Sequence, residues 1–338
     1  MKKLLLLIIV FPIIVFSQEG QIIDSKDVIE KNGLLLLKSN STLITGTIKY
    51  WYENGKLKEE VNIKDGKLDG ICKKWYENGQ LSYEITYNEG IANGVIKKWH
   101  ENGQLMRQTP KKNDKIEGVA KEWYENGQLK REQTNRDGKI DGFDKEWYEN
   151  GQLSFEGFYK DGKAEGVQTE WHQNGQLKAK GSFKNDLKEG LAEWWFENGQ
   201  LKEKVTFKND KKEGLAEWWY ENGQLKEEVT FLDGQLIGLG REWHQNGQLK
   251  GEGLFNKGQQ EGLWKWWYEN GQIEGEWTYK NGDLISFYNN YSSKIIPMID
   301  TLGKTDIVIR SAASGNINLL ENNDYKLLKD LIETAASR

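Results

Sequence analysis

The chain has 338 residues, of which 47 are basic and 52 acidic, and its formal net charge is −5. Nucleic-acid binding depends on dense positive charge, so this balance excludes a polyanion-binding role for the whole chain. Hydrophobic residues make up only 37%, yet fifteen residues are tryptophan and aromatics reach 12%. We therefore expect large rings buried in thin layers in place of a thick aliphatic core.

Residues 1–17 are predicted to be a signal peptide. The charged start Met1-Lys2-Lys3 precedes an apolar run from Leu4 to Phe16, which is shorter than a membrane span requires. An uncleaved N-terminal anchor is the alternative. Cleavage before Gln18 would export the protein to the periplasm, the cell surface or the medium. The single thiol, Cys72, occupies a slot that isoleucine or alanine fills in other repeats, which indicates a packing role.

Residues 46–284 are a tandem array of ten repeats with a constant length of 24 residues. A tryptophan marks the same position of every copy, a glycine stands five residues before it, and Asn-Gly follows three and four residues after it. We interpret these tryptophans as structural anchors of the repeats; they are Trp51, Trp75, Trp99, Trp123, Trp147, Trp171, Trp195, Trp219, Trp243 and Trp267.

Each repeat is predicted to be one β-hairpin. In the seventh copy an aromatic-rich strand over residues 191–196 leads into Asn198-Gly199, a pair that tolerates the positive φ angles of a tight turn. In the second strand, Leu201, Val205 and Phe207 are expected on one face. A second turn follows at residues 208–210. The predicted fold class is all-β: an elongated meander of ten antiparallel hairpins, stabilised by contacts between neighbouring copies.

The two ends depart from the repeat. Residues 18–45 are expected to form an N-terminal cap or degenerate repeat that covers the first strand edge. Residues 285–338 form a tail with a β-like run at 306–309 and an amphipathic helix at 325–336, which serves as a cap or docks a partner. Repeats three and four carry Pro110, Lys111 and Asn135 where other copies favour strand or aromatic residues, so we expect the weakest strand pairing there.

The sequence from Gly118 to Lys130, Gly-x4-Trp-Tyr-Glu-Asn-Gly-x-Leu-Lys, resembles the variant MORN repeat. The serial arrangement is similar to YwqK-type antitoxins of toxin–antitoxin systems. The resemblance implies a β-hairpin scaffold, a membrane-associated platform or a partner-binding module without enzymatic activity. An exported antitoxin of this kind would neutralise a toxin outside the cytoplasm, as an immunity protein does.

No constellation typical of an enzyme is present. The three histidines, His100, His172 and His244, occupy the slot after the anchor tryptophan where tyrosine or phenylalanine stands elsewhere, and they lie 72 residues apart. The turn acids from Glu53 to Glu269 recur once per repeat, too sparsely to coordinate calcium. The sequence has no phosphate loop or dinucleotide motif. We therefore expect no catalytic residue, metal or cofactor.

Adjacent aromatics in repeats seven, eight and ten suggest a binding surface. Neighbouring strand residues point to opposite faces, so one ring of each pair is free to meet a ligand if the other packs. A thin sheet that packs rings on both faces is the alternative. The predicted binding residues are Trp194, Trp218, Trp266, Phe196, Tyr220 and Tyr268.

The resulting hypothesis is a non-enzymatic repeat scaffold that binds a protein partner, either an antitoxin-like or immunity interaction or an envelope component. A module for lipid head groups or cell-wall glycans is the alternative, and nucleic acid is not expected as a partner.

Overall fold

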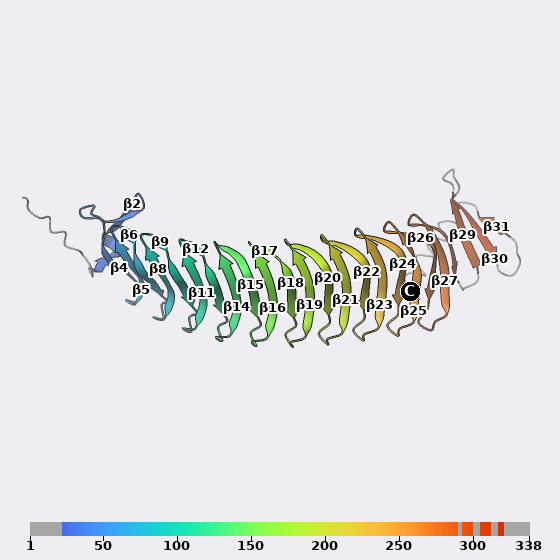
Figure 1. The fold of residues 1–338 in the computed structure, drawn as a ribbon, viewed down its shortest axis with the longest axis horizontal. Coiled ribbons are helices and arrows are strands. Elements are labelled where there is room, and N and C mark those ends of the chain that lie inside the picture. Colours follow the sequence, from blue (N-terminus) through green and yellow to red (C-terminus); the bar gives the residue numbers. More distant parts are fainter. Residues whose placement is uncertain (1–21, 290–292, 300–304, 312–316, 321–338) are drawn as a thin grey trace, which may run out of the picture. The chain divides into compact units, whose positions relative to one another are not determined.

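The computed structural model describes residues 22–289, 293–299, 305–311 and 317–320. Contacts divide the chain into two units, residues 1–151 and 152–338. In each unit, antiparallel hairpins follow one another in chain order (Figure 1). The described residues contain strands and one short 3-10 helix but no α-helix, and none of their helices could cross a membrane. The predicted all-β fold of serial hairpins is confirmed, while the predicted helix at 325–336 lies outside the described residues.

The described part of unit 1, residues 22–151, contains fifteen strands and the 3-10 helix η1 (Ser25–Asp27). Its strands are β1 (Ile22–Asp24), β2 (Val28–Lys31), β3 (Leu34–Leu37), β4 (Gly46–Trp51), β5 (Leu57–Lys64), β6 (Lys67–Leu68), β7 (Gly70–Trp75), β8 (Leu81–Asn88), β9 (Ile91–Ala92), β10 (Gly94–Trp99), β11 (Leu105–Lys112), β12 (Lys115–Ile116), β13 (Gly118–Trp123), β14 (Leu129–Arg136) and β15 (Lys139–Trp147).

Unit 2 continues the same alternation of strands and turns beyond the last repeat. Its strands are β16 (Leu153–Lys160), β17 (Lys163–Ala164), β18 (Gly166–Trp171), β19 (Leu177–Lys184), β20 (Leu187–Trp195), β21 (Leu201–Lys208), β22 (Lys211–Trp219), β23 (Leu225–Leu232), β24 (Gln235–Trp243), β25 (Leu249–Asn256), β26 (Gln259–Trp267), β27 (Ile273–Lys280), β28 (Asp283–Asn289), β29 (Ser293–Ile299), β30 (Thr305–Ser311) and β31 (Ile317–Leu320). The β-like run at 306–309 lies within β30.

The segment before the first repeat covers its edge strand. Strand β1 pairs in parallel with β4, so the backbone groups of this edge are partly paired. Strands β2 and β3 form a separate hairpin. Four isoleucines, Ile23, Ile44, Ile48 and Ile63, form a buried cluster that joins this segment to repeat one. Aliphatic burial therefore holds the segment against the array.

The second turn of each repeat is the tight hairpin turn. In repeat seven, Asn209 and Asp210 have φ angles of 49° and 65°, and in repeat eight Asp233 and Gly234 have 54° and 81°. Two consecutive positive φ values are typical of a type I′ turn, which Asn, Asp and Gly tolerate best. The turn chemistry thus explains why these residue types recur at the second turn.

The first turn differs from the prediction. In Asn198-Gly199 only the glycine takes a positive φ, 83°. The asparagine acts through its side chain, because its Oδ1 accepts a hydrogen bond of 2.9 Å from the backbone N–H of Gln200. Phe196 N–H also donates to the Gln200 carbonyl, which closes a longer loop than a two-residue turn. The expectation that both residues supply positive φ was wrong for this reason.

Side-chain hydrogen bonds join each turn to the next copy. The Nδ2 of Asn198 donates to the carbonyl of Glu221 at 2.8 Å, and Asn222 donates likewise to Gln245. At the second turn, the Oε2 of Glu189 accepts from the N–H of Asn209 at 2.9 Å. The asparagine recurs in every repeat, and the carboxylate bond recurs where an acid occupies the slot of Glu189, though not at Ile237. These bonds let a repeat gain stability from its neighbour.

A β-bulge sits beside each anchor tryptophan. In repeat seven, Trp194 pairs with Glu203 while Trp195 pairs with Leu201, so Lys202 is an extra residue. Partners that stand opposite each other share a face, which places Leu201 with Trp195 and away from Val205. The prediction that Leu201, Val205 and Phe207 share one face was therefore wrong for Leu201, because the bulge interrupts the strict alternation of side chains between the two faces.

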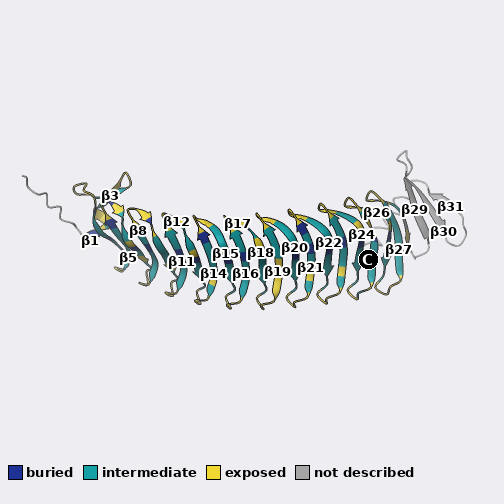
Figure 2. Ribbon diagram, viewed as in Figure 1, coloured by how far each residue is buried: buried dark blue, intermediate teal, exposed yellow. Residues whose placement is uncertain are grey.

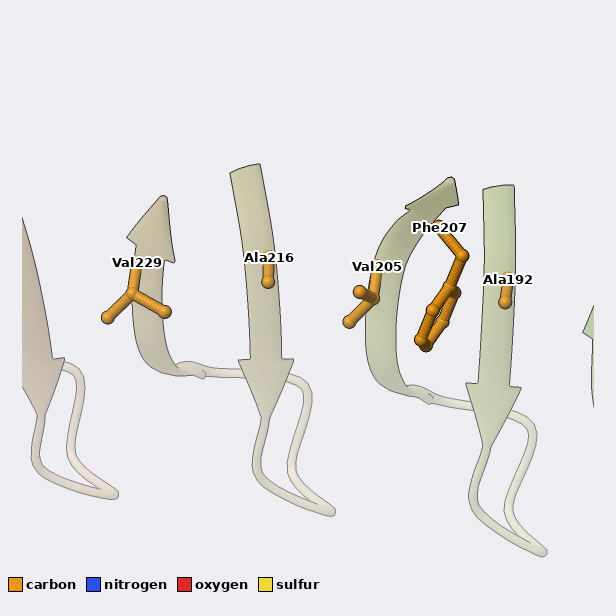
Figure 3. Close-up of a cluster of buried hydrophobic side chains, with 5 residues drawn as sticks. All are labelled: Ala192, Val205, Phe207, Ala216 and Val229. Carbon is orange, nitrogen blue, oxygen red and sulfur yellow. The ribbon is translucent and has the colours of Figure 1, made fainter. Parts of the chain in front are cut away.

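The core of unit 2 is a row of small residues on one face. Ala192 pairs with Val205, Val205 with Ala216, and Ala216 with Val229. Their exposed fractions are 6%, 1%, 0% and 3% for Ala192, Val205, Ala216 and Val229 respectively. Figure 3 shows this row with Phe207 beside it. Most other strand residues are only half-buried, as Figure 2 shows, so the interior is one side chain thick.

In unit 1 the equivalent row begins with apolar residues such as Ile48 and Cys72 and takes in polar residues from repeat three onward. Asp144 takes the slot of Ala192 and is 3% exposed. It accepts two hydrogen bonds from the guanidinium of Arg131, at 2.8 and 2.6 Å, and this pairing raises the pKa of Arg131. Thr109 and Asn135 are also buried, and Asn135 donates to the carbonyl of Gln133. Repeats three to five therefore bury polar side chains together with apolar ones such as Ala120.

Candidate functional site

Unit 2 carries large rings on the same face as its buried alanine and valine row. We call this set the aromatic face. Trp194, Trp218, Phe231 and Phe255 pack against the buried row while remaining half-buried themselves. The aromatic face comprises Trp194, Phe207, Trp218, Phe231, Phe255, Trp264, Trp266, Trp277 and Tyr279.

Tryptophan and glutamate alternate across the strands of this face. Trp194 stands opposite Glu203, Glu203 opposite Trp218, and Trp218 opposite Glu227. Directly paired residues have Cβ atoms about 4.5–5.5 Å apart, so each carboxylate lies beside an indole. Glu227 then stands opposite a second acid, Glu242. The face therefore offers both ring surfaces and negative charge.

The environment of Glu227 disfavours its charge. Burial raises the pKa of Glu227 above the ordinary carboxyl value, and the neighbouring Glu242 raises it further. The ammonium groups of Lys226, Lys212 and Lys250 oppose this shift without cancelling it. Glu227 is thus a half-buried carboxylate with incomplete charge compensation.

Two lysines of the chain lie over rings of the aromatic face. The Nζ of Lys188 is 5.8 Å from the Trp194 ring centroid and 5.0 Å from that of Phe207. The Nζ of Lys212 is 4.8 Å from the ring of Trp218 and 5.3 Å from that of Phe231. All four distances fall within the range of cation–π attraction.

In repeat ten the rings themselves fill the face. Trp264, 6% exposed, stacks on Trp266 at 5.9 Å and meets Phe255 edge-on at 5.0 Å. Glycines make room for these rings, since a Cβ on Gly251 would clash with Trp266 and one on Gly253 with Trp264. Small and large residues are therefore matched across neighbouring strands.

A pocket of about 140 Å³ opens on this face at repeats six and seven. Its lining includes Trp194, Phe183, Lys188 and Gly181. The absence of a side chain on Gly181 and the short Ala179 leave space beside the indole of Trp194. The pocket is large enough for a few water molecules or one side chain of a ligand.

Trp194, Trp218 and Trp266, predicted from sequence as binding residues, all lie on the aromatic face. They share that face with the buried row, whereas each adjacent anchor tryptophan points to the opposite face. The anchors are half-buried, except Trp51, which is 58% exposed. Rings therefore occupy both faces, and the aromatic face is the one with the denser ring contacts.

Phe196, Tyr220 and Tyr268 lie in the first turn, immediately after the strands that carry the aromatic face. The hydroxyl of Tyr220 donates to the carbonyl of Trp243 at 2.9 Å. The Nζ of Lys202 lies 5.6 Å from the Phe196 ring, and that of Lys226 lies 5.8 Å from the Tyr220 ring. Phe196 and Tyr220 are thus engaged in contacts that brace the turn.

The histidines occupy the same turn slot and make the same bond. The Nε2 atoms of His100, His172 and His244 lie 3.1, 3.0 and 2.7 Å from the carbonyls of Trp123, Trp195 and Trp267. A carbonyl only accepts, so Nε2 carries the proton in this bond. Histidine replaces tyrosine here as a ring with a donor at its tip. Among the described residues no cluster of three metal-ligating side chains occurs.

Sequence reasoning missed Lys188, Lys212 and Glu227. The signal was available, because Lys188, Lys212, Leu236 and Gln260 occupy one repeat position and Glu203 and Glu227 occupy another. Their side chains come together only through the register of neighbouring strands, which the repeat length alone does not give.

The opposite face of unit 2 combines apolar and charged rows. Leu191, Leu215, Leu239 and Leu263 are 40–50% exposed and recur every repeat. Beside them lie ion pairs such as that of Arg241 with Glu228 at 2.8 Å. Exposed pairs of this kind contribute little stability. The ring contacts of Trp194, Trp264 and Trp266 lie on the aromatic face instead.

These features define a tandem β-hairpin repeat protein whose distinctive surface is the aromatic face. The chain belongs to the MORN repeat variant family, which matches more than half of its length. The matched residues are 44–65, 68–89, 92–113, 116–134, 145–161, 164–185, 188–209, 212–233, 236–257 and 260–281.

Other comparisons add no functional information. No curated protein matches the chain. Two solved structures, TcdB2-TccC3 without its hypervariable C-terminal region and TcdB2-TccC3-TEV, are 12% and 13% identical, with TM-scores of 0.17 and 0.16. Each likeness covers 86% of this chain and 18% of the other. At such TM-scores the likeness carries no argument about fold or function.

Proposed function

We propose that this MORN repeat protein is a non-enzymatic scaffold that binds a protein partner through the aromatic face of repeats seven to ten. The observation that carries the proposal is the set of half-buried rings at Trp194, Trp218 and Trp266. The first two pack against the buried row, and Trp266 stacks on the buried Trp264. Rings held rigidly in this way contribute strongly to protein interfaces, since little side-chain freedom is lost on binding.

Carboxylates between the rings support a protein ligand over an anionic lipid surface. Glu203 and Glu227 would repel anionic head groups. The same polar groups can select one polypeptide among many through charge complementarity. Binding of lipid head groups or wall glycans is retained as an outcome of the experiment below.

An exported, immunity-like role is part of the proposal. The apolar run after Met1-Lys2-Lys3 supports export to the envelope or the medium. There an antitoxin-like scaffold would neutralise a toxin outside the cytoplasm, or it would hold an envelope component in place. Both roles require one stable protein partner and no catalysis.

The test is affinity capture of the full-length tagged protein from its own cells, with a triple variant Trp194→Ala, Trp218→Ala and Trp266→Ala. The matched control replaces Leu191, Leu215 and Leu263 by alanine, on the same three strands but on the opposite face. We expect the wild type and the leucine variant to retain a stoichiometric partner that the tryptophan variant loses. Circular dichroism checks that each variant folds.

Two results would contradict the proposal. Retention of every partner by a folded tryptophan variant would exclude the aromatic face as the binding surface. Recovery of only lipid or wall polymer, checked by liposome flotation and cell-wall sedimentation, would favour the alternative ligand class. Recovery of a toxin among the partners would support the antitoxin-like form of the proposal.

A further inference from the structure

The chain contains its own example of a cation bound on the aromatic face. The ammonium of Lys212, at the end of repeat seven, lies over Trp218 and Phe231 of repeat eight and forms an ion pair of 3.4 Å with Glu203. Two rings and one carboxylate therefore surround a single cationic group. Lys188, one repeat earlier, lies over Trp194 and Phe207 in the same manner.

One repeat further along, the carboxylate is present and the lysine is not. Glu227 is the repeat equivalent of Glu203, and Leu236 is the equivalent of Lys212. The register confirms the correspondence, because Lys212 pairs with Phe207 and Leu236 pairs with Phe231. The cation that Lys212 supplies to Glu203 in repeat seven therefore has no counterpart beside Glu227 in repeat eight.

Neighbouring groups do not replace that cation. Glu242, which stands opposite Glu227, accepts a hydrogen bond of 2.6 Å from Lys250. No ion pair to Glu227 occurs within the described part of the chain. The indole of Trp218 stands directly opposite Glu227 on the other side. Glu227 is thus a half-buried carboxylate with a ring neighbour and without an ion pair, and the lysines around it compensate its charge only in part.

We propose that this position binds a lysine or arginine side chain of the protein partner, with its cationic head against Glu227 and its aliphatic stem along Trp218 and Leu236. The proposal rests on the proposed function and specifies the chemistry of the partner. Lysine and arginine fit because they join an apolar stem to a charged head, and the site joins an apolar wall to a carboxylate. Arginine would add a second hydrogen bond through its planar fork.

The inference predicts that a lysine introduced into the chain itself can occupy the site beside Glu227. Leu236→Lys introduces the residue found at the equivalent positions 188 and 212, so the fold accepts it in this slot. The new ammonium should pair with Glu227 as Lys212 pairs with Glu203, and it should exclude an external cation. Glu227→Gln removes the charge without removing the side chain.

The probe is the labelled peptide acetyl-Ser-Leu-Lys-Leu-Ser-amide, compared with versions that carry Arg, Met or Glu at the centre. Binding to the full-length protein is measured by fluorescence anisotropy. We expect the Lys and Arg peptides to bind roughly ten-fold more tightly than the Met peptide, as one charge-assisted contact implies. Glu227→Gln and Leu236→Lys should each abolish this preference. The control Glu193→Gln, on the opposite face of the sheet, should keep it.

The inference is wrong if the Lys peptide binds no better than the Met peptide, whether both bind or neither does. It is also wrong if Glu227→Gln and Glu193→Gln behave alike. Affinity capture separates this failure from failure of the proposed function. A partner lost by the tryptophan variant but kept by both Glu227→Gln and Leu236→Lys would leave the aromatic face as the binding surface and remove the cationic site.

Discussion

Replacement of Gly253 by alanine tests the matching of small and large residues on the aromatic face. A Cβ at this position would fall inside the indole of Trp264, closer than side chains approach in real structures. Trp264 is 6% exposed and is held by Phe255 and Trp266 at ring distances of 5.0 and 5.9 Å, so it cannot move aside freely. Overpacking of this kind costs about 1–3 kcal/mol.

Gly181→Ala is the matched control, because it occupies the same repeat position. Its Cβ would meet the Cβ of Ala192 at 3.4 Å, an ordinary contact. Alanine also loses less backbone freedom on folding than glycine, a gain of about 0.5–1 kcal/mol that applies to both variants. We therefore expect Gly181→Ala to be neutral or stabilising and Gly253→Ala to be destabilising by about 1–2 kcal/mol.

Urea unfolding followed by tryptophan fluorescence measures the difference between the two variants. Since repeats can unfold separately, hydrogen exchange of the amides in β25 and β26 provides a local readout. Near-ultraviolet circular dichroism reports any reorientation of Trp264. Equal stability and equal exchange rates in Gly253→Ala and Gly181→Ala would refute the argument from ring packing.

Three further variants test charge and hydrogen bonding. Glu227→Gln should raise the urea midpoint at neutral pH and leave it unchanged at low pH. The pKa of Glu227 is raised in the folded state, so its stabilising contribution is complete below the ordinary carboxyl pKa and is lost as pH rises through the folded value. A midpoint gain that is independent of pH would contradict this. Tyr220→Phe should cost about 0.5–1.5 kcal/mol through loss of the bond to Trp243, and no change in midpoint would exclude a bracing role. Asp144→Ala should cost about 1–3 kcal/mol, less than a fully buried pair because the Arg131 side chain is 37% exposed. Addition of Arg131→Met should recover part of this loss in urea unfolding.

Much of the fold was predictable from local residue chemistry. The constant spacing from Trp51 to Trp267 predicted serial hairpins, and Asn209-Asp210 is the kind of pair that a type I′ turn selects. The site was predictable only in part. Trp194, Trp218 and Trp266 were identified as candidate binding residues from their adjacency to the anchors, but the lysines and glutamates between them were not. The contact of Lys212 with Glu203 depends on the register of β21 against β22, and that register is not readable from the repeat spacing.

The sequence by itself determined the repeat, the turns and the hairpin pairing, because these depend on spacing and on backbone preferences within about one copy. Tertiary structure decided which face carries the packed row. One extra residue at Lys202 shifts Leu201 to the face of Trp195, and strand register then sets Trp218 beside Glu227. A bulge reverses side-chain direction without changing the repeat length, so only the paired strands reveal where ring and charge meet.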